Sequence, residues 1–329
     1  MNALRIPLLA VDGGGTKSLA IFMNMEEQIL GQGQAGSCNY QGVGKHTAAK
    51  SLISCLKEAI ADFERKQKPE SFSSIEVECA VFGMAGLDTK QDRQVILEMI
   101  REVLQEVQIH PRHLWVENDG FATLLGETEG KPGILIIAGT GSIVYGVNEE
   151  GIYARTSGWG HRIGDEGSGY WIGKQAVTAI LRAEDGRGKK TRLGDWIFPH
   201  IGATSGEELV NWVYGPQYSI EKMAELAPFV YQAYQAGDEV AQEILQKASE
   251  ELFIAARAVI HQLQLVEKPF QIILQGGILK HIDFVRQSLI QQLQDYVPLA
   301  EIDLGKRDPI SGIITKGLSY LKEKKKNGC

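Results

Sequence analysis

The chain has 329 residues, which exceeds the size at which one hydrophobic core usually stops growing, so two domains are expected. Its 41 acidic and 34 basic residues give a net charge of −7, which argues against a dedicated nucleic-acid or membrane-surface binder, because such proteins need a basic face. The opening MNALRIPLLAVDGGG has too short an apolar run for a signal peptide, and no run reaches transmembrane length, so a cytoplasmic protein is predicted.

The cysteines are scattered and form no CxxC motif: they are Cys38, Cys55, Cys79 and Cys329. Zinc sites and redox-active disulfides need closely spaced cysteines. The pattern therefore favours reduced thiols that serve mainly as packing residues.

The first third of the chain alternates strands with helices. Residues 8–12 and 16–23 read as strands around a glycine turn, and apolar periodicity predicts helices over 46–66 and 91–107. Further strands are expected over 74–86 and 113–120, so the order is hairpin, helix, strand, helix and strand. This order predicts α/β layers around a mixed sheet.

A second copy of the strand–glycine turn–strand pattern that begins the chain starts near residue 132. Residues 132–147 read as strand, glycine-rich turn and strand, and the following loop-rich stretch leads into a mostly helical region. Within that region, 239–265 is predicted to form one long amphipathic helix. A strand within 269–281, a strand over 298–304 and a last helix complete the chain. The repeated hairpin indicates an internal duplication, and the lack of a low-complexity linker predicts two tightly joined domains with a cleft between them.

The glycine turns predict close contact between backbone and an anion, because glycine removes the Cβ and lets N–H groups approach phosphate. A P-loop is excluded, since the nearest candidate at 44–46 fails the GxxxxGK[ST] pattern. A GxGxxG pattern does occur over 31–36, but SCNYQG follows it instead of a helix start, so a strand end or loop is predicted there. Turns of two hairpins, at Gly13–Gly15 and Gly139–Gly141, remain as the phosphate candidates.

The motifs VDGGGTKS, AGTGS and LQGG stand in the order and spacing of the two phosphate loops and the adenosine loop of the sugar kinase and actin superfamily. Together with GSCNY, VENDG and the long run GWGHRIGDEGSGYWIG, they make the chain resemble the BadF/BadG/BcrA/BcrD ATPase family and, within it, the N-acetylglucosamine kinases. The resemblance implies two ribonuclease H-like (actin-like ATPase) α/β domains with an interdomain cleft. The first would span 1–118 with helix 311–326 packing back on it, and the second 119–310 with a helical insertion.

The resemblance also assigns residues to ATP and Mg²⁺. Asp12 would hold Mg²⁺ through water, since Mg²⁺ keeps much of its hydration shell. The residues expected at phosphates and adenosine are Gly14, Gly15, Thr16, Lys17, Thr140, Gly141, Ser142, Gly276 and Gly277. Without the resemblance, each of these would read as a tight turn or an exposed strand residue.

The resemblance implies that Asp119 is the catalytic base and contacts the sugar, although ENDGFATLL would also allow an N-cap at this position. The other residues expected at the sugar are Asn39, Gly158, Trp159, Gly160 and Asp165. Trp159 stands between glycines in a polar loop, which is a poor place for a core residue. A metal site at His161, Asp165 and Glu166 is disfavoured, because their spacing matches no standard ligand pattern.

The resulting hypothesis is a cytoplasmic, homodimeric kinase that transfers the γ-phosphate of ATP to the 6-hydroxyl of N-acetylglucosamine. N-acetylmuramic acid, both sugars, or glucosamine remain open as substrates. A different class, the ATPase activators of iron–sulfur dehydratases, would need the closely spaced cysteines that this chain lacks. A non-catalytic sugar sensor is disfavoured because Asp12, Thr16 and Asp119 are all present.

Overall fold

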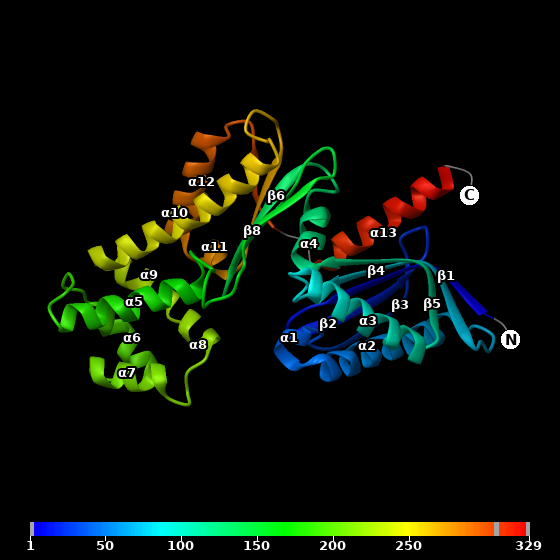
Figure 1. Ribbon diagram of the computed structural model, residues 1–329, viewed down its shortest axis with the longest axis horizontal. Helices are drawn as coiled ribbons and strands as arrows, with labels where there is room; N and C mark the ends of the chain where they lie inside the picture. The colour runs from blue at the N-terminus through cyan, green and yellow to red at the C-terminus, as the bar shows by residue number, and fades with distance from the viewer. Residues whose placement is uncertain (1–2, 306–308, 327–329) are drawn as a thin grey trace. The chain divides into compact units, whose positions relative to one another are not determined.

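The computed structural model describes residues 3–305 and 309–326, and the chain divides into two compact units (Figure 1). The first unit comprises Met1–Gly130 and Lys306–Cys329, and the second comprises Lys131–Gly305. The sequence-based division ended the first domain at residue 118. The compact units divide after Gly130 instead, because the helix that begins at Asp119 packs within the first unit.

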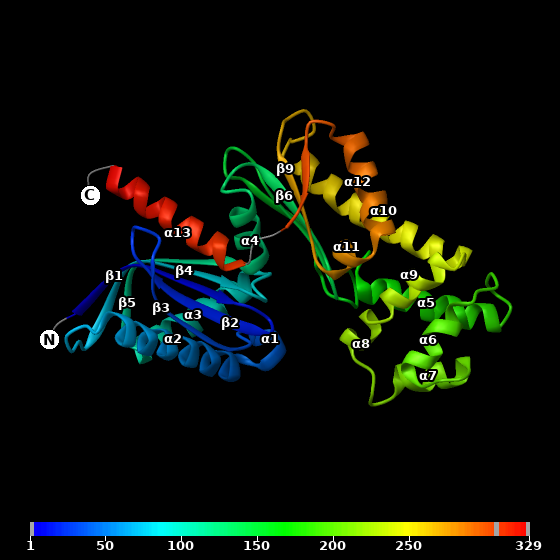
Figure 2. The same ribbon diagram turned by 180° about the vertical axis from the view of Figure 1, so that it is seen from behind.

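A five-stranded mixed sheet with strand order β3-β2-β1-β4-β5 forms the centre of the first unit. Its strands are β1 (Ala3–Gly13), β2 (Lys17–Met23), β3 (Ile29–Gly36), β4 (Ser74–Met84) and β5 (Ile109–Asn118). Its helices are α1 (Tyr40–Val43), α2 (Lys45–Gln67), α3 (Lys90–Glu106), α4 (Asp119–Glu127) and α13 (Pro309–Lys326). Helices α2 and α3 cover one face of the sheet, and α4 and α13 cover the other (Figures 1 and 2).

The GxGxxG pattern lies in β3, where its glycines permit close packing of α2. A Cβ at Gly33 would lie 2.3 Å from the Cys55 carbonyl oxygen, and one at Gly31 would lie 2.6 Å from that of Ala59. The helix backbone therefore rests directly on the strand. These glycines serve helix–sheet packing. The sequence predicted a strand end or loop over 31–36, whereas these residues form most of the eight-residue strand β3.

Helix α13 returns to the first unit and packs on α4 through glycine. A Cβ at Gly312 would lie 1.6 Å from the Ala122 carbonyl oxygen, and one at Gly126 would lie 2.5 Å from the Gly312 nitrogen. The two helix backbones are thus in direct contact. Both α4 and α13 therefore pack within the first compact unit.

A second five-stranded mixed sheet, with order β10-β9-β6-β7-β8, forms the second unit. Its strands are β6 (Gly133–Ala138), β7 (Ser142–Val147), β8 (Tyr153–Ser157), β9 (Gln271–Gln275) and β10 (Glu301–Leu304). Its helices are α5 (Gly169–Glu184), α6 (Leu193–Ile201), α7 (Gly206–Tyr214), α8 (Ile220–Ala224), α9 (Ala227–Gln235), α10 (Glu239–Gln262), α11 (Gly277–His281) and α12 (Asp283–Tyr296).

The two sheets share one topology. In each, three consecutive strands form an antiparallel meander, and two later strands add in parallel beside the first strand of that meander. The expected architecture of two α/β units with the same opening hairpin is therefore confirmed. Strand β8 was not predicted from the sequence because this edge strand has no apolar run, and only Ala154 within it is buried.

The described cysteines are buried packing residues. Cys38, Cys55 and Cys79 are free thiols, whereas Cys329 lies outside the described residues. Burial raises the pKa of Cys55 to about 11 and that of Cys79 to about 12, so both thiols are protonated and unreactive at neutral pH. Among the helices in the described ranges, none is both long enough and apolar enough to cross a membrane.

Candidate functional site

The turn between β1 and β2 exposes the first glycine motif. A Cβ at Gly14 would lie 2.8 Å from the Lys17 carbonyl oxygen, so the turn itself requires glycine there. A Cβ at Gly15, by contrast, would have no heavy atom within 4 Å, and Gly15, Thr16 and Lys17 are exposed. The fold of the chain gives no steric reason for glycine at position 15, so the predicted phosphate contact there stays a prediction.

The loop that carries Asn39 is fastened to this turn. The Cys38 amide donates to the Gly14 carbonyl oxygen at 3.1 Å. The Asn39 side chain caps α1 by accepting from the Gln41 amide at 3.1 Å. Gly86 has a φ of +78°, and a Cβ there would lie 2.5 Å from Asn39 Oδ1. Asn39 is therefore held between the turn and the loop after β4.

Asp92, which the sequence analysis missed, anchors the Asn39 loop to α3. Its carboxylate accepts hydrogen bonds from the Tyr40 hydroxyl, from Gln41 Nε2 at 3.1 Å, and from the Thr89 amide and hydroxyl, both at 2.7 Å. Burial opposes the charged form, but these hydrogen bonds outweigh it and lower the pKa of Asp92 to about 2. Only the capping-box pattern at Thr89 and Asp92 was visible in the sequence.

We expect Asp92→Asn to lower the free energy of unfolding by about 2 kcal/mol near neutral pH. A carboxyl whose pKa is depressed in the folded state stabilises the protein above its unfolded pKa, near 4, and loses that effect as the pH falls toward 2. The difference from wild type should therefore shrink between pH 5 and pH 3 in urea titrations. Glu98→Gln, on the exposed side of the same helix, is the matched control; an equal loss in both variants would contradict the anchoring role.

Asp119 stands at the same edge of the sheet as the glycine turn. Gly13 pairs in register with Met84 of β4, and Met84 pairs with Asn118 of β5. The ends of three adjacent parallel strands therefore align, and two strand spacings of about 4.8 Å place the first residue of α4 about 10 Å from the turn. The N-cap of α4 is Asn118, whose Oδ1 accepts from the Gly120 amide at 2.8 Å, so Asp119 is not needed for capping.

The surroundings of Asp119 favour a carboxyl that can accept a proton. Burial raises its pKa, while a hydrogen bond from the Gly120 amide at 2.9 Å opposes part of the shift. A raised carboxyl pKa brings proton affinity closer to neutral pH, which suits a general base. The arrangement can accept a proton from a hydroxyl placed between Asp119 and the turn.

In the second unit, the turn between β6 and β7 meets the start of α5 and the LQGG motif. The amides of Gly169 and Tyr170 donate to the carbonyl oxygens of Gly139 at 2.8 Å and of Thr140 at 3.2 Å. A Cβ at Gly139 would lie 4.0 Å from the Gly277 nitrogen, so the turn and the paired glycines are neighbours. The second predicted phosphate turn and the predicted adenosine loop thus lie together.

A cavity of about 490 Å³ opens beside these two glycine motifs. Gly139, Thr140, Gly169 and Gly277 line it, together with residues of α8, α9 and α11 that include Tyr231 and His281. This volume is in the range of small-ligand sites and is large enough for a nucleoside. The helical wall could not be predicted from the sequence, because no local pattern marks residues that converge from three separate helices.

The loop that follows β8 is bound to the second glycine turn through Asp165. Its Oδ1 accepts from the Gly160 amide at 3.2 Å, and a Cβ at Gly141 would lie 2.8 Å from its Oδ2. Burial raises the pKa of Asp165, and hydrogen bonds from the Gly160 and Ser142 amides oppose that shift. Asp165 therefore positions the loop against the turn, and its predicted contact with sugar stays a prediction.

Trp159 lies on this loop with 59% of its surface exposed, under the Arg155 guanidinium, whose Cζ is 4.7 Å from the ring centroid. Its exposure agrees with the expectation that it is no core residue. Gly158 and Gly160, on either side, both have positive φ, at +69° and +85°, which glycine adopts without strain. The loop thus presents an aromatic face to its surroundings.

Asp12 fits the predicted magnesium role as a single carboxylate beside the glycine turn. A Cβ at Gly14 would lie 3.7 Å from Asp12 Oδ1, which places the carboxylate under the turn. Mg²⁺ is commonly bound by one or two carboxylates together with substrate phosphates and water, so a lone aspartate is sufficient. Within residues 3–305 and 309–326, no group of three or more His, Cys, Asp or Glu side chains is arranged to hold a metal by itself.

Comparison with known proteins extends these observations. The model of the BadF/BadG/BcrA/BcrD ATPase family matches residues 9–312. The chain is 33% identical over 307 residues to the N-acetylmuramic acid/N-acetylglucosamine kinase of Clostridium acetobutylicum, covering 93% of this chain and 96% of that relative. It is 31% identical to the N-acetyl-D-glucosamine kinase of Dictyostelium discoideum, covering 95% of this chain and 98% of the relative.

Among solved structures, a candidate N-acetylglucosamine kinase from Chromobacterium violaceum is 26% identical and superposes with a TM-score of 0.70, covering 94% of this chain and 98% of that one. The likeness in fold therefore extends over nearly the whole of both chains. Together with the match to the family model and the two relatives, it leads to one conclusion: this protein belongs to the BadF/BadG/BcrA/BcrD ATPase family.

Proposed function

We propose that this protein is a sugar kinase that transfers the γ-phosphate of ATP to a hydroxyl of an N-acetylated amino sugar. The observation that carries the proposal is the aligned strand edge of the first unit, where an exposed glycine turn and Asp119 stand about two strand spacings apart. A phosphate donor at the turn and a hydroxyl at the carboxylate would face each other across that distance. The kinase names of two relatives at 33% and 31% identity support the same reaction.

In the proposed reaction, the sugar hydroxyl oxygen attacks the γ-phosphorus, the bond to the β-phosphate oxygen breaks, and ADP leaves. Asp119 accepts the hydroxyl proton. Asp12 would hold Mg²⁺ through water, and the ion would neutralise phosphate charge. The backbone of Gly14–Lys17 and of Thr140–Ser142 would bind phosphates, while the cavity beside Gly276 and Gly277 would take adenosine.

The substrate that we favour is N-acetylglucosamine, phosphorylated at its 6-hydroxyl, with Asn39, Gly158–Gly160 and Asp165 as further contacts. N-acetylmuramic acid is a second candidate, because the Clostridium acetobutylicum relative is named for both sugars. Magnesium dependence, a homodimer and a cytoplasmic location remain predictions of the same proposal.

The deciding experiment is a coupled assay of ADP release with MgATP against N-acetylglucosamine, N-acetylmuramic acid, glucosamine, N-acetylmannosamine and glucose. Turnover with N-acetylglucosamine alone supports the favoured substrate. Comparable turnover with N-acetylmuramic acid supports a dual kinase. ADP release that is independent of sugar contradicts the kinase and favours an ATPase that acts on a protein partner.

Gly15→Ala tests the glycine turn without disturbing the fold. Because a Cβ at Gly15 meets no heavy atom within 4 Å, the variant should fold and melt like wild type. If phosphate lies against this backbone, the added methyl should lower kcat/KM for ATP about tenfold, the effect of a modest steric clash. Gly42→Ala is the control, because a Cβ at Gly42 also meets no heavy atom within 4 Å and Gly42 lies outside the turn. Unchanged kinetics in Gly15→Ala would contradict phosphate binding at Gly15.

A further inference from the structure

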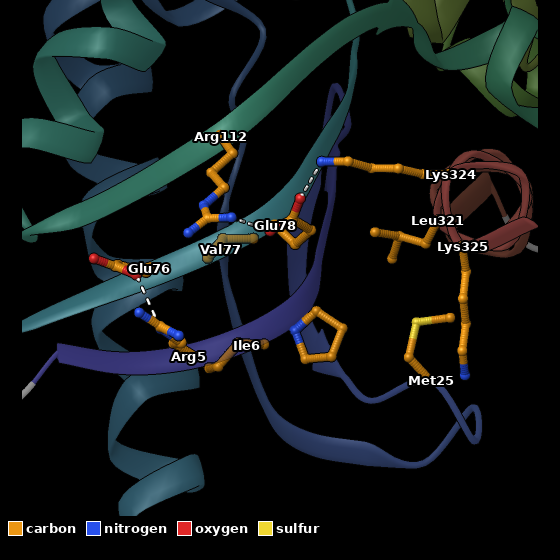
Figure 3. Close-up of a pocket in the computed structure, with 11 residues that line it drawn as sticks. Arg5, Ile6, Met25, Glu76, Val77, Glu78, Arg112, Leu321, Lys324 and Lys325 are labelled. Atoms are coloured by element: carbon orange, nitrogen blue, oxygen red, sulfur yellow. Dashed lines mark hydrogen bonds and ion pairs between the residues drawn. The ribbon is translucent and has the colours of Figure 1, made fainter. Parts of the chain in front are cut away.

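A second cavity, of about 480 Å³, lies in the first unit near the N-terminal ends of β1 and β4 (Figure 3). Pro7 of β1 contributes apolar surface, whereas the side chains of Ile6 and Val77, which also border the cavity, are buried in the core that α2 and α3 cover. Leu321 from α13 and Met25 from the turn after β2 add to the apolar lining. A volume of this size is typical of small-molecule sites.

Charged side chains make up much of the cavity lining, and cations outnumber carboxylates. Four cationic residues and two glutamates line it: Arg5, Arg112, Lys324, Lys325, Glu76 and Glu78. The excess of two positive charges stands in a chain whose net charge is −7. A local surplus of this sign, against the charge of the whole chain, attracts anions to this place.

The carboxylates of the rim are already neutralised. The Glu78 carboxylate forms ion pairs with Lys324 Nζ at 2.6 Å and with the Arg112 guanidinium at 3.3 Å. The two cations approach it from opposite sides, as Figure 3 shows. The hydrogen bond from Lys324 lowers the pKa of Glu78, so the carboxylate stays charged between two cations. Arg5 pairs with Glu76 at 3.2 Å. Lys325 makes no ion pair with any residue of the described chain and extends along the Met25 side of the cavity.

The cavity is separate from the groups proposed for catalysis. Ile6 precedes Gly13, the last residue of β1, by seven residues, which corresponds to about 23 Å at 3.3 Å per residue. A ligand of nucleotide size at this cavity therefore cannot reach the glycine turn or Asp119. Whatever binds here does so in addition to the substrates of the proposed kinase.

We propose that this cavity binds a phosphate monoester carried on a compact ring system. A phosphate dianion matches the surplus of two charges, and the Arg112 guanidinium and the two lysine ammonium groups are the donors that proteins use for phosphate. The apolar surface at Pro7, Met25 and Leu321 then packs against the body of the ligand. Nucleoside monophosphates and hexose phosphates both carry this chemistry, so the test must separate them.

Methionine methyl groups give a direct test by NMR on the full-length protein. Met25 lines the cavity, whereas Met84 lies beside Gly13 at the first glycine turn and Met223 lies in the second unit. We would titrate methyl-labelled protein with AMP, with glucose 6-phosphate and with inorganic phosphate, each at up to millimolar concentration. A saturable shift of Met25 with one of the two monoesters, and a much weaker response to inorganic phosphate, is the expected result.

Variants separate binding at this cavity from binding at the catalytic groups. Arg112→Gln combined with Lys325→Gln should weaken the Met25 response at least about tenfold, the effect of losing charged hydrogen bonds. The responses of Met84 and Met223 should not change. Lys322→Gln is the matched control, because Lys322 lies on the same helix, pairs with Glu27 and does not line the cavity.

Three results would overturn the proposal. Met25 could fail to shift with either monoester, or its shift could persist undiminished in the double variant. Inorganic phosphate could also bind as tightly as the monoesters, which would remove the ring system from the recognition. None of these readouts depends on kinase turnover, so the outcome stands apart from that of the sugar assay.

Discussion

Replacing Asp119 with asparagine is expected to lower kcat by about 10²- to 10⁴-fold, the contribution of general-base catalysis, while KM for the sugar stays near wild type. Asparagine keeps the shape of the side chain and its place at the first residue of α4. It cannot accept the hydroxyl proton as the bond to phosphorus forms. Because Asn118 provides the helix cap, the substitution should not destabilise α4.

The comparison should include Asp295→Asn, at an exposed aspartate of α12 whose carboxylate accepts a hydrogen bond from the Gln291 side chain at 2.9 Å. That variant should keep wild-type kinetics. Steady-state assays with varied sugar and varied ATP give kcat and both KM values. If Asp119→Asn retained near-normal kcat, Asp119 would not be the base, and the aligned strand edge would no longer support the proposed reaction.

The pH profile of the wild-type protein offers an independent check on the same group. Burial raises the pKa of Asp119, and a base works only when it is deprotonated. The acid limb of kcat/KM should therefore lie above the pH at which an ordinary aspartate titrates. Activity should fall as the pH drops through that raised pKa, and a limb in the ordinary range would show that burial does not govern the group.

The paired glycines of LQGG should respond in opposite ways to alanine. Gly276 has a φ of +99°, and its Cβ would lie 2.3 Å from the Ala138 carbonyl oxygen, so Gly276→Ala should prevent proper folding of the second unit. At Gly277, a Cβ meets no heavy atom within 4 Å, so Gly277→Ala should fold normally. If adenosine occupies the adjoining cavity, Gly277→Ala should nevertheless raise KM for ATP about tenfold or more.

Thermal melting and circular dichroism separate the two outcomes, and the kinetic comparison is then made on the folded variant alone. Gly237→Ala, at a glycine with open space but a φ of +86°, measures the cost of positive φ without a clash. A Gly276→Ala protein that folds normally would contradict the geometry of the turn. A Gly277→Ala protein with wild-type KM for ATP would place the nucleotide elsewhere.

Much of the fold was accessible from the sequence because its signals are local. Apolar periodicity marked α2 and α10 to within a few residues, and the two glycine hairpins with their flanking apolar strands revealed the duplication. The motifs themselves pointed to phosphate and to the family. A periodicity or a turn is encoded by neighbouring residues, so its physical cause can be read along the chain.

Other features depend on residues that are distant in sequence and were decided only by tertiary structure. The register Gly13–Met84–Asn118, which sets Asp119 beside the glycine turn, arises from strand pairing across about a hundred residues. The Asp92 carboxylate accepts hydrogen bonds from the side chains of Tyr40 and Gln41, which lie in α1, about fifty residues earlier in the chain. In LQGG, the two glycines differ in role because Gly276 lies against the backbone of Ala138 and Gly277 does not. By itself the sequence determined the elements and the chemical groups, whereas packing determined which groups meet, since distance in space is set by long-range contacts.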